Sequence, residues 1–292
     1  MRQRRKNLRN GLLFVMPWLI GFSFFLAYPT IASLYYSLSV YDMFTPPKWN
    51  GFGNYWELFH DPIFWISLSN TFYYAIFAIP LGQVIALLLA LLLNTKVKAM
   101  PVFRTIYFLP TIVPPVVIAI LWLWIFNTRY GVLNALLAGI GIRGPNWLGD
   151  PAWAKPALIL MSFWTVGQPM IIYLAGLQDV PQQLYEAAEL DGANWWQKTL
   201  RITLPMVSPA MLLNVIIGLI WAMQIFTLPY IMTGGGPMRA TTFYALYLYE
   251  NAFQFFKMGY ASAMAWLLFI IILTCTLIIF KISSKKIYYA GK

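Results

Sequence analysis

The chain has 292 residues, of which 60% are hydrophobic and 10% are charged, whereas ordinary soluble domains have roughly 45–50% apolar and about 25% charged residues. This composition excludes an ordinary soluble domain and places the chain in the membrane class, with lipid as its surroundings. The net charge of +11 does not indicate nucleic-acid binding, because long charge-free segments separate the basic residues.

Six segments without Asp, Glu, Lys or Arg divide the chain. A charge near the bilayer centre costs at least about 2.5 kcal/mol, so charge-free segments of more than about 20 residues indicate transmembrane helices. The segments run from Gly11 to Tyr41, Ile63 to Thr95, Thr105 to Thr128, Pro156 to Gln178, Ile202 to Met238 and Met258 to Phe280. We predict a single all-α transmembrane domain over 1–292, with spans near 12–38, 67–94, 105–127, 156–178, 206–232 and 258–281.

The first span follows a basic start, Arg2 to Arg9, but it is too long for a signal peptide and lacks a small-residue cleavage site, so we expect a retained helix. Prolines within the spans, Pro114 and Pro115 among them, predict kinks and helix starts. Fourteen Lys and Arg residues fall on the N-terminal side of the six spans and six on the other side. The bias predicts a plasma (inner) membrane protein with both termini in the cytoplasm.

The segment between the fourth and fifth spans, 179–205, differs from the other connections. Glu186 to Leu190 is a run of good helix formers, Gly192 permits a turn, and Ala193 to Leu200 can begin a second helix. Small alanines permit close approach by a partner, and exposed carboxylates accept hydrogen bonds from arginine. The segment therefore predicts a helical hairpin on the cytoplasmic surface, either a docking element or an ordinary solvated hairpin.

The spacing within this hairpin resembles the EAA loop of permease subunits in binding-protein-dependent ABC importers. Glu186, Ala187 and Ala188 are followed after three residues by Gly192, and after nine more by Ile202-Thr203-Leu204-Pro205. Further likeness to the sugar-class, maltose-transporter-like branch lies in Gly51-Phe52-Gly53-Asn54-Tyr55, Phe103-Arg104-Thr105 with Leu109-Pro110, and Thr233-Gly234-Gly235-Gly236-Pro237 with Thr241-Thr242. The resemblance covers nearly the whole chain.

The resemblance implies a six-helix type I importer permease bundle (MetI-like) that imports a carbohydrate by alternating access. It implies that Glu186, Ala187, Ala188, Asp191 and Gly192 couple the chain to an ATPase dimer, which binds ATP and Mg. It also implies a second permease subunit, favouring a heterodimer, and an extracytoplasmic solute-binding protein that contacts Gly234, Gly235, Gly236 and Pro237.

A sugar path needs aromatic faces and hydrogen-bonding groups. Trp164 and Gln168 are four residues apart in the fourth span, and Trp221 and Gln224 are three apart in the fifth, so we expect each pair to share a helical face. In the resembled family these helices line the central cavity. The alternative is that these aromatics serve as packing residues or interface anchors and not as substrate contacts.

No catalytic chemistry or cofactor is expected in this chain. Gly139, Gly141 and Gly144 spell G-x-G-x-x-G, but Pro145 follows where a helix should start, and there is no P-loop sequence. One cysteine, Cys275, and one histidine, His60, do not make a metal site. Two other classes stay open: an ion-coupled secondary transporter, disfavoured because no span holds a mid-membrane carboxylate or base, and a structural or regulatory membrane protein.

Overall fold

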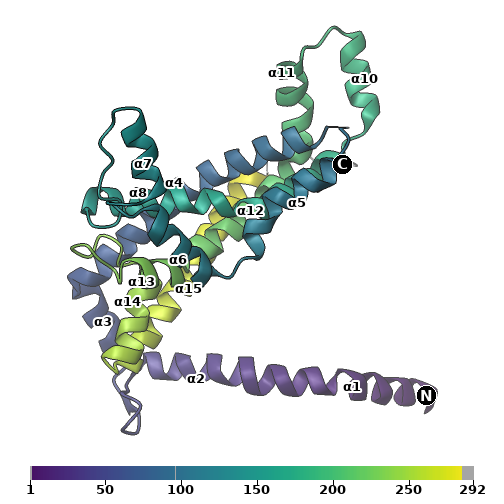
Figure 1. The fold of residues 1–292 in the computed structure, drawn as a ribbon. Helices are drawn as coiled ribbons and strands as arrows, with labels where there is room; N and C mark the ends of the chain where they lie inside the picture. Colours follow the sequence, from purple (N-terminus) through teal and green to yellow (C-terminus); the bar gives the residue numbers. More distant parts are fainter. Residues whose placement is uncertain (1, 96, 285–292) are drawn as a thin grey trace. The chain divides into compact units, whose positions relative to one another are not determined.

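The computed structural model describes residues 2–95 and 97–284, and these are mostly helical (Figure 1). Four of the basic residues behind the predicted orientation, Lys96, Lys285, Lys286 and Lys292, lie outside the described residues. The elements in chain order are α1 (Arg2–Phe22), η1 (Ser23–Ala27), α2 (Tyr28–Ser37), β1 (Ser39–Val40), β2 (Lys48–Trp49), α3 (Gly53–His60), α4 (Pro62–Leu93), α5 (Met100–Ile112), α6 (Pro115–Ile125), α7 (Val132–Gly139), α8 (Pro151–Ser162), η2 (Phe163–Thr165), α9 (Gly167–Gln178), α10 (Gln182–Leu190), α11 (Trp195–Lys198), η3 (Thr199–Thr203), α12 (Leu204–Met223), α13 (Thr227–Met232), α14 (Tyr244–Tyr249), η4 (Glu250–Gln254) and α15 (Met258–Ser284).

The predicted spans appear in the structure as four long helices and two bent pairs. The long apolar helices cover Asn10–Ser37, Pro62–Leu93, Trp195–Met232 and Met258–Ser283. The pair α5 and α6 is bent by 97°, and the pair α8–η2 and α9 by 46°. Counting each bent pair as one span gives the six that the sequence predicts.

The bend between α5 and α6 follows from two consecutive prolines. Val113 is extended, with φ −67° and ψ 130°, as expected for a residue that precedes proline. Pro114 caps the next helix and Pro115 begins it, where the missing N–H is not needed. The proline pattern thus predicts the break, although not its 97° size.

The chain divides into two compact units; that it forms a single domain stays a prediction. The first unit comprises 2–61 and 248–269. In it, α1, η1 and α2 form one helix, and β1 pairs with β2 in an antiparallel hairpin. Asn54 ties that hairpin to α3 by donating to the carbonyl oxygens of Ser37 and Ser39, at 2.8 and 2.9 Å.

Further polar contacts within the first unit join α3 and its hairpin to the start of α15. Tyr260 donates to the Asp61 carboxylate at 2.8 Å, and Lys257 pairs with Glu57 at 3.0 Å.

In the hairpin turn, the Asp42 carboxylate accepts from the Thr45 backbone N–H and hydroxyl. These hydrogen bonds lower the pKa of Asp42, since they favour its charged form.

The second unit comprises 62–247 and 270–284 among the described residues, and α4, α9 and α12 pack together at its centre. Small residues on α4, such as Ala86 and Ala90, are fully buried and permit close helix approach, as is common in membranes. The buried residues form two separate apolar clusters, one around Tyr74, Leu158 and Phe243 and one around Met170, Tyr173 and Val207.

A polar chain joins the three central helices of the second unit. The Tyr173 hydroxyl donates to Gln83 Oε1 at 2.7 Å, and Gln83 Nε2 donates to the carbonyl oxygen of Asn214 at 3.3 Å. Asn214 Nδ2 in turn donates to the carbonyl oxygen of Pro169 at 3.0 Å. This contact holds the start of α9 against α12.

Candidate functional site

Helices α10 and α11 form a hairpin that extends past the ends of α4 and α5, whereas α7 and α13 lie at the opposite end of the second unit (Figure 1). The hairpin carries the five predicted coupling residues. Glu186, Ala187 and Asp191 are exposed, and Ala188 is half-buried. Within the described chain, neither the Glu186 nor the Asp191 carboxylate has a hydrogen-bond or ion-pair partner. Both carboxylates are therefore available to a basic partner surface.

The turn of the hairpin depends on the backbone of Gly192. Its φ is +74°, and a Cβ placed on it would meet no atom within 4 Å, so the requirement for glycine is conformational and not steric. The N–H of Ala193 donates to the carbonyl oxygen of Ala188 at 2.8 Å, which closes α10 with a Schellman motif. The structure confirms the helix, turn and helix that the sequence predicts.

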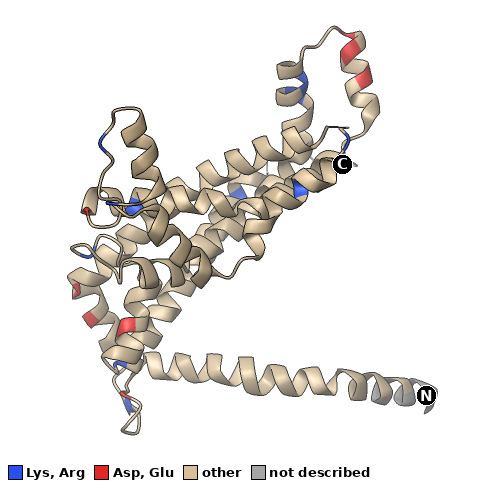
Figure 2. Ribbon diagram, viewed as in Figure 1, with Lys and Arg blue, Asp and Glu red and all other residues tan. Residues whose placement is uncertain are grey.

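Three side-chain interactions stabilise the hairpin and its attachment to α12. Asn194 and Gln197 form a capping box at the start of α11. Lys198 pairs with Glu189 at 2.7 Å, between the acidic α10 and the basic α11 (Figure 2). At the base, the Tyr185 hydroxyl lies 2.9 Å from Thr203 Oγ1, where the π-helix η3 leads into α12. Helix α10 is thereby bonded to the segment that leads into α12.

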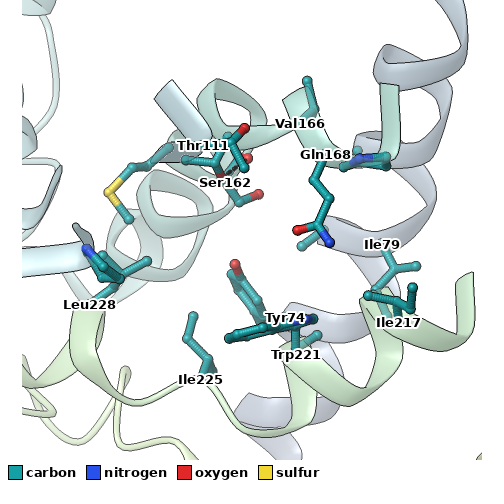
Figure 3. A pocket seen from close by; sticks show the side chains of 18 of the residues that line it. Tyr74, Ile79, Thr111, Ser162, Val166, Gln168, Ile217, Trp221, Ile225 and Leu228 are labelled. Atoms are coloured by element: carbon teal, nitrogen blue, oxygen red, sulfur yellow. Dashed lines mark hydrogen bonds between the residues drawn. The ribbon is translucent and has the colours of Figure 1, made fainter. Parts of the chain in front are cut away.

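A cavity of about 450 Å³ lies in the second unit, among α4, α5, α6, α8, α9 and α12. Three predicted path residues, Gln168, Trp221 and Gln224, line it. In Figure 3, Gln168, Tyr74 and Trp221 converge on one open space. Trp221 is 72% exposed, and among the described residues the amides of Gln168 and Gln224 have no hydrogen-bond partner. The cavity can thus offer an aromatic face and two free amides to a polar solute.

The structure places Trp164 away from this cavity. Residues 163–165 form a 3₁₀ turn, Val166 interrupts the helix, and α9 begins at Gly167. The prediction that Trp164 and Gln168 share one helical face is therefore wrong. Trp164 packs in the apolar cluster instead, with its ring 6.3 Å from that of Trp122.

The helix break at Val166 has a packing cause that is visible at Gly167. A Cβ on Gly167 would lie 2.5 Å from Thr111 Oγ1 and 2.8 Å from the carbonyl oxygen of Tyr107. The start of α9 therefore packs directly against the α5 backbone. The sequence gives no sign of this contact, because a glycine in an apolar run is compatible with several roles.

Several further residues that sequence reasoning missed line the cavity. Their shared feature is a polar group on an apolar helix: Tyr74, Gln83, Thr111, Ser162, Thr165, Asn214 and Thr227. Gln83 and Asn214 use their amides in the contacts between central helices, whereas Thr111 Oγ1 is buried without a partner among the described atoms. The sequence could have indicated Gln83 and Asn214, because each is an amide within a long apolar run.

The predicted binding-protein contact, Gly234 to Pro237, lies in a turn after α13. Gly234 and Gly235 have φ of +55° and +87°, and a Cβ on Gly235 would lie 2.7 Å from Thr242 Oγ1. The carbonyl oxygens of Gly235 and Gly236 accept from the hydroxyls of Thr242 and Thr241, at 3.0 and 2.6 Å. The glycine run thus serves first to build the turn.

A bundle of bent membrane helices around a cavity, with a helical hairpin beyond one end, is the architecture of a transporter's membrane subunit. The chain belongs to the family described as binding-protein-dependent transport system inner membrane component, whose model matches residues 78–288. It is thus a multi-pass membrane permease subunit, and the family resemblance that the sequence predicts is confirmed.

Relatives of known name match the chain over nearly its full length. It is 43% identical to the probable ABC transporter permease protein YesP of Bacillus subtilis, over 100% of this chain and 96% of YesP. It is 36% identical to the lactose transport system permease protein LacF of Rhizobium radiobacter, over 95% of each. Among solved structures it is similar to a chain of a bacterial alginate ABC transporter in complex with an alginate pentasaccharide-bound periplasmic protein. That likeness has a TM-score of 0.84 and 26% identity, covering 98% of both chains.

Proposed function

We propose that this permease forms half of the pathway of an ATP-driven importer for a carbohydrate. Relatives named for lactose and alginate support this substrate class. The cavity supports it independently, because a sugar ring stacks its C–H face on an aromatic ring while its hydroxyls need polar partners. Trp221 supplies the ring, and Gln168 and Gln224 supply free amides.

Energy for transport comes from a separate ATPase dimer that docks on the α10–α11 hairpin and holds ATP and Mg. The observation that carries this proposal is the exposed hairpin with its unpaired Glu186 and Asp191 carboxylates. A basic group of the ATPase would pair with Glu186 in a charge-assisted hydrogen bond. Gly192 holds the turn that presents this helix.

The remainder of the assembly consists of a second, different permease subunit and an extracytoplasmic solute-binding protein. The open side of the cavity, where Trp221 is mostly exposed, would face the second permease. The excess of Lys and Arg on the N-terminal side of the spans supports cytoplasmic termini. That orientation puts the hairpin on the cytoplasmic side and the Gly234–Pro237 turn on the outer side.

Transport then proceeds by alternating access. ATP binding closes the ATPase dimer, and the hairpin passes this movement to α12 through the Tyr185–Thr203 contact. Because α12 also lines the cavity, the same helix joins the site of docking to the site of transport. The cavity switches between inward and outward access as the two permeases rearrange.

Uptake by the reconstituted complex tests the proposal. Proteoliposomes holding both permeases and the ATPase, supplied with the solute-binding protein, are assayed with labelled lactose, maltose and alginate oligosaccharides. We expect uptake of at least one of them that requires ATP inside and the binding protein outside. Uptake by the chain alone, driven by an ion gradient, would instead identify a secondary transporter.

A further inference from the structure

The loop between Thr233 and Thr242 has an unusual backbone beyond its glycines. Met238 and Arg239 have φ of +48° and +60°, in the left-handed region that L residues rarely adopt. Two consecutive left-handed non-glycine residues are costly, and such conformations persist only where the surroundings enforce them.

Hydrogen bonds from the loop and from α4 enforce this conformation. Within the loop, the Ala240 N–H donates to the Pro237 carbonyl oxygen at 2.8 Å, and the hydroxyls of Thr233 and Thr241 lie 2.6 Å apart. From α4, Asn70 Nδ2 donates to the carbonyl oxygens of Arg239 and Thr242, at 2.9 and 3.1 Å. The loop is therefore a fixed structure and not a flexible connection.

Asn70 is itself held in place. Its Oδ1 accepts from Lys155 Nζ of α8 at 2.9 Å, and that ammonium lies 4.8 Å from the centroid of the Tyr73 ring. Asn70 is 4% exposed. One buried amide thus links α4, α8 and the loop, and its three contacts all lie within hydrogen-bond distance.

With the loop held by these hydrogen bonds, Met238 points away from the protein. Its side chain is 90% exposed, and Arg239 beside it is exposed as well. A single exposed apolar residue is ordinary on a protein surface. Here, however, a fixed and strained loop displays it, which lowers the entropy lost when a partner binds. Methionine adapts its shape to an apolar recess.

The occupant that fits this display is the solute-binding protein, and this inference rests on the proposed function. The loop lies at the end of the second unit opposite the hairpin (Figure 1), and its exposed, charged Arg239 suits an aqueous surface and not lipid. The similar alginate transporter chain was solved in complex with a periplasmic protein.

We propose that Met238 and Arg239, and not the glycine run itself, dock onto the solute-binding protein, Met238 in an apolar recess and Arg239 against a carboxylate at its edge. The contact reaches the transport cavity through α4. Tyr74 and Ala78 follow Asn70 by one and two helical turns and line the cavity.

Binding-protein-stimulated ATP hydrolysis by the complete complex in nanodiscs tests the proposal. Met238→Ala is expected to raise the half-maximal concentration of binding protein about tenfold, the scale of losing a central anchor. Arg239→Glu should raise it further, while basal hydrolysis and the saturated rate stay unchanged. Met43→Ala is the matched control, because Met43 is also exposed and left-handed, with φ +68°, and should have no effect.

Three outcomes would count against this proposal. An unchanged half-maximal concentration in Met238→Ala, in a complex whose wild type is stimulated, overturns the docking role and leaves the proposed function intact. Loss of the second permease from the Met238→Ala complex, with binding-protein affinity kept, shows that the other permease covers this residue. A wild-type complex that no solute-binding protein stimulates overturns the proposed function, and the docking role with it.

Discussion

Gly167 and Gly192 are both required at functional positions, but for different physical reasons. At Gly167 the requirement is space, since the α5 backbone lies where a side chain would begin. At Gly192 space is free and the requirement is a left-handed φ. The motif spacing predicts the requirement for glycine at position 192. Nothing in the sequence predicts the requirement at Gly167, because its contact with α5 joins residues far apart in the chain.

Substituting Gly167 by alanine is expected to destabilise the fold by about 1–3 kcal/mol, the usual cost of overpacking. The added methyl group would overlap Thr111 Oγ1 and the Tyr107 carbonyl oxygen. The thermal midpoint in detergent measures the loss. Gly82→Ala is the matched control, because its nearest neighbour, Val166 Cγ1, lies 3.9 Å away and alanine is the better helix former. Equal midpoints for the two variants would show that α5 and α9 are not in this close contact.

The cavity shows which of its lining residues the sequence could predict. Trp221, Gln168 and Gln224 line the cavity, although Gln168 lies beyond the helix break at Val166 and Gln224 follows the last residue of α12. Trp164 fails because helical spacing assumes a continuous helix, and the helix is interrupted at Val166. Their contact with a substrate stays a prediction.

At the scale of elements, the hairpin is bonded to the segment that leads into α12. Helix α10 is short, and nine residues would be only marginally helical on their own. It is stabilised by Tyr185, which packs on the apolar cluster around Tyr173 and contacts Thr203. The π-helix η3 lies between the hairpin and α12, and such segments often mark functional sites.

Removing the contact at the base of the hairpin should loosen α10. Tyr185→Phe and Thr203→Val are each expected to speed hydrogen exchange in α10 about two- to tenfold, as for one net hydrogen bond of about 0.5–1.5 kcal/mol. The double variant should match Thr203→Val, because that variant already removes the bond to Tyr185 together with the 3.4 Å bond from Thr203 Oγ1 to the Lys198 carbonyl oxygen. Hydrogen exchange followed by mass spectrometry measures this.

Thr199→Val is the control for these variants. Thr199 lies at the start of the same π-helix and is 7% exposed, and its hydroxyl makes no hydrogen bond within the described chain. Its exchange should match the wild type. Fully additive effects of Tyr185→Phe and Thr203→Val would contradict a direct bond between them.

Element boundaries were predictable where chemistry is local and not where packing decides. The six apolar segments and the Pro114–Pro115 break follow from composition and proline geometry. The direction of α6 after its 97° bend does not, because it depends on which helices α6 packs against. The same holds for the loop 233–242, whose shape depends on Asn70, far away in the sequence.

At the scale of the whole molecule, the proposed function requires the α10–α11 hairpin and the loop 233–242 to face opposite sides of the membrane. A cysteine at Leu190, 92% exposed in the wild type, should react with an impermeant maleimide only after cells are permeabilised. A cysteine at Met238, 90% exposed, should react in intact cells. Both substitutions are made in a Cys275→Ser background. Labelling of the Leu190→Cys protein in intact cells would reverse the predicted orientation.

Family membership and near-complete alignment with sugar permeases establish the kind of molecule, and the proposed mechanism depends on the hairpin. Its unpaired Glu186 and its left-handed Gly192 suit the docking of a partner protein. The central claim is therefore that this hairpin joins the membrane helices to the ATPase.

Co-purification of the ATPase with tagged permease variants tests this claim most directly. Glu186→Lys reverses the docking charge, and Gly192→Pro cannot adopt the required φ of +74°. We predict that both variants insert in the membrane at wild-type levels but lose the ATPase. Glu57→Lys, which breaks only an exposed ion pair, should retain it. An ATPase that still co-purifies with Glu186→Lys and Gly192→Pro, together with normal uptake, would contradict the account.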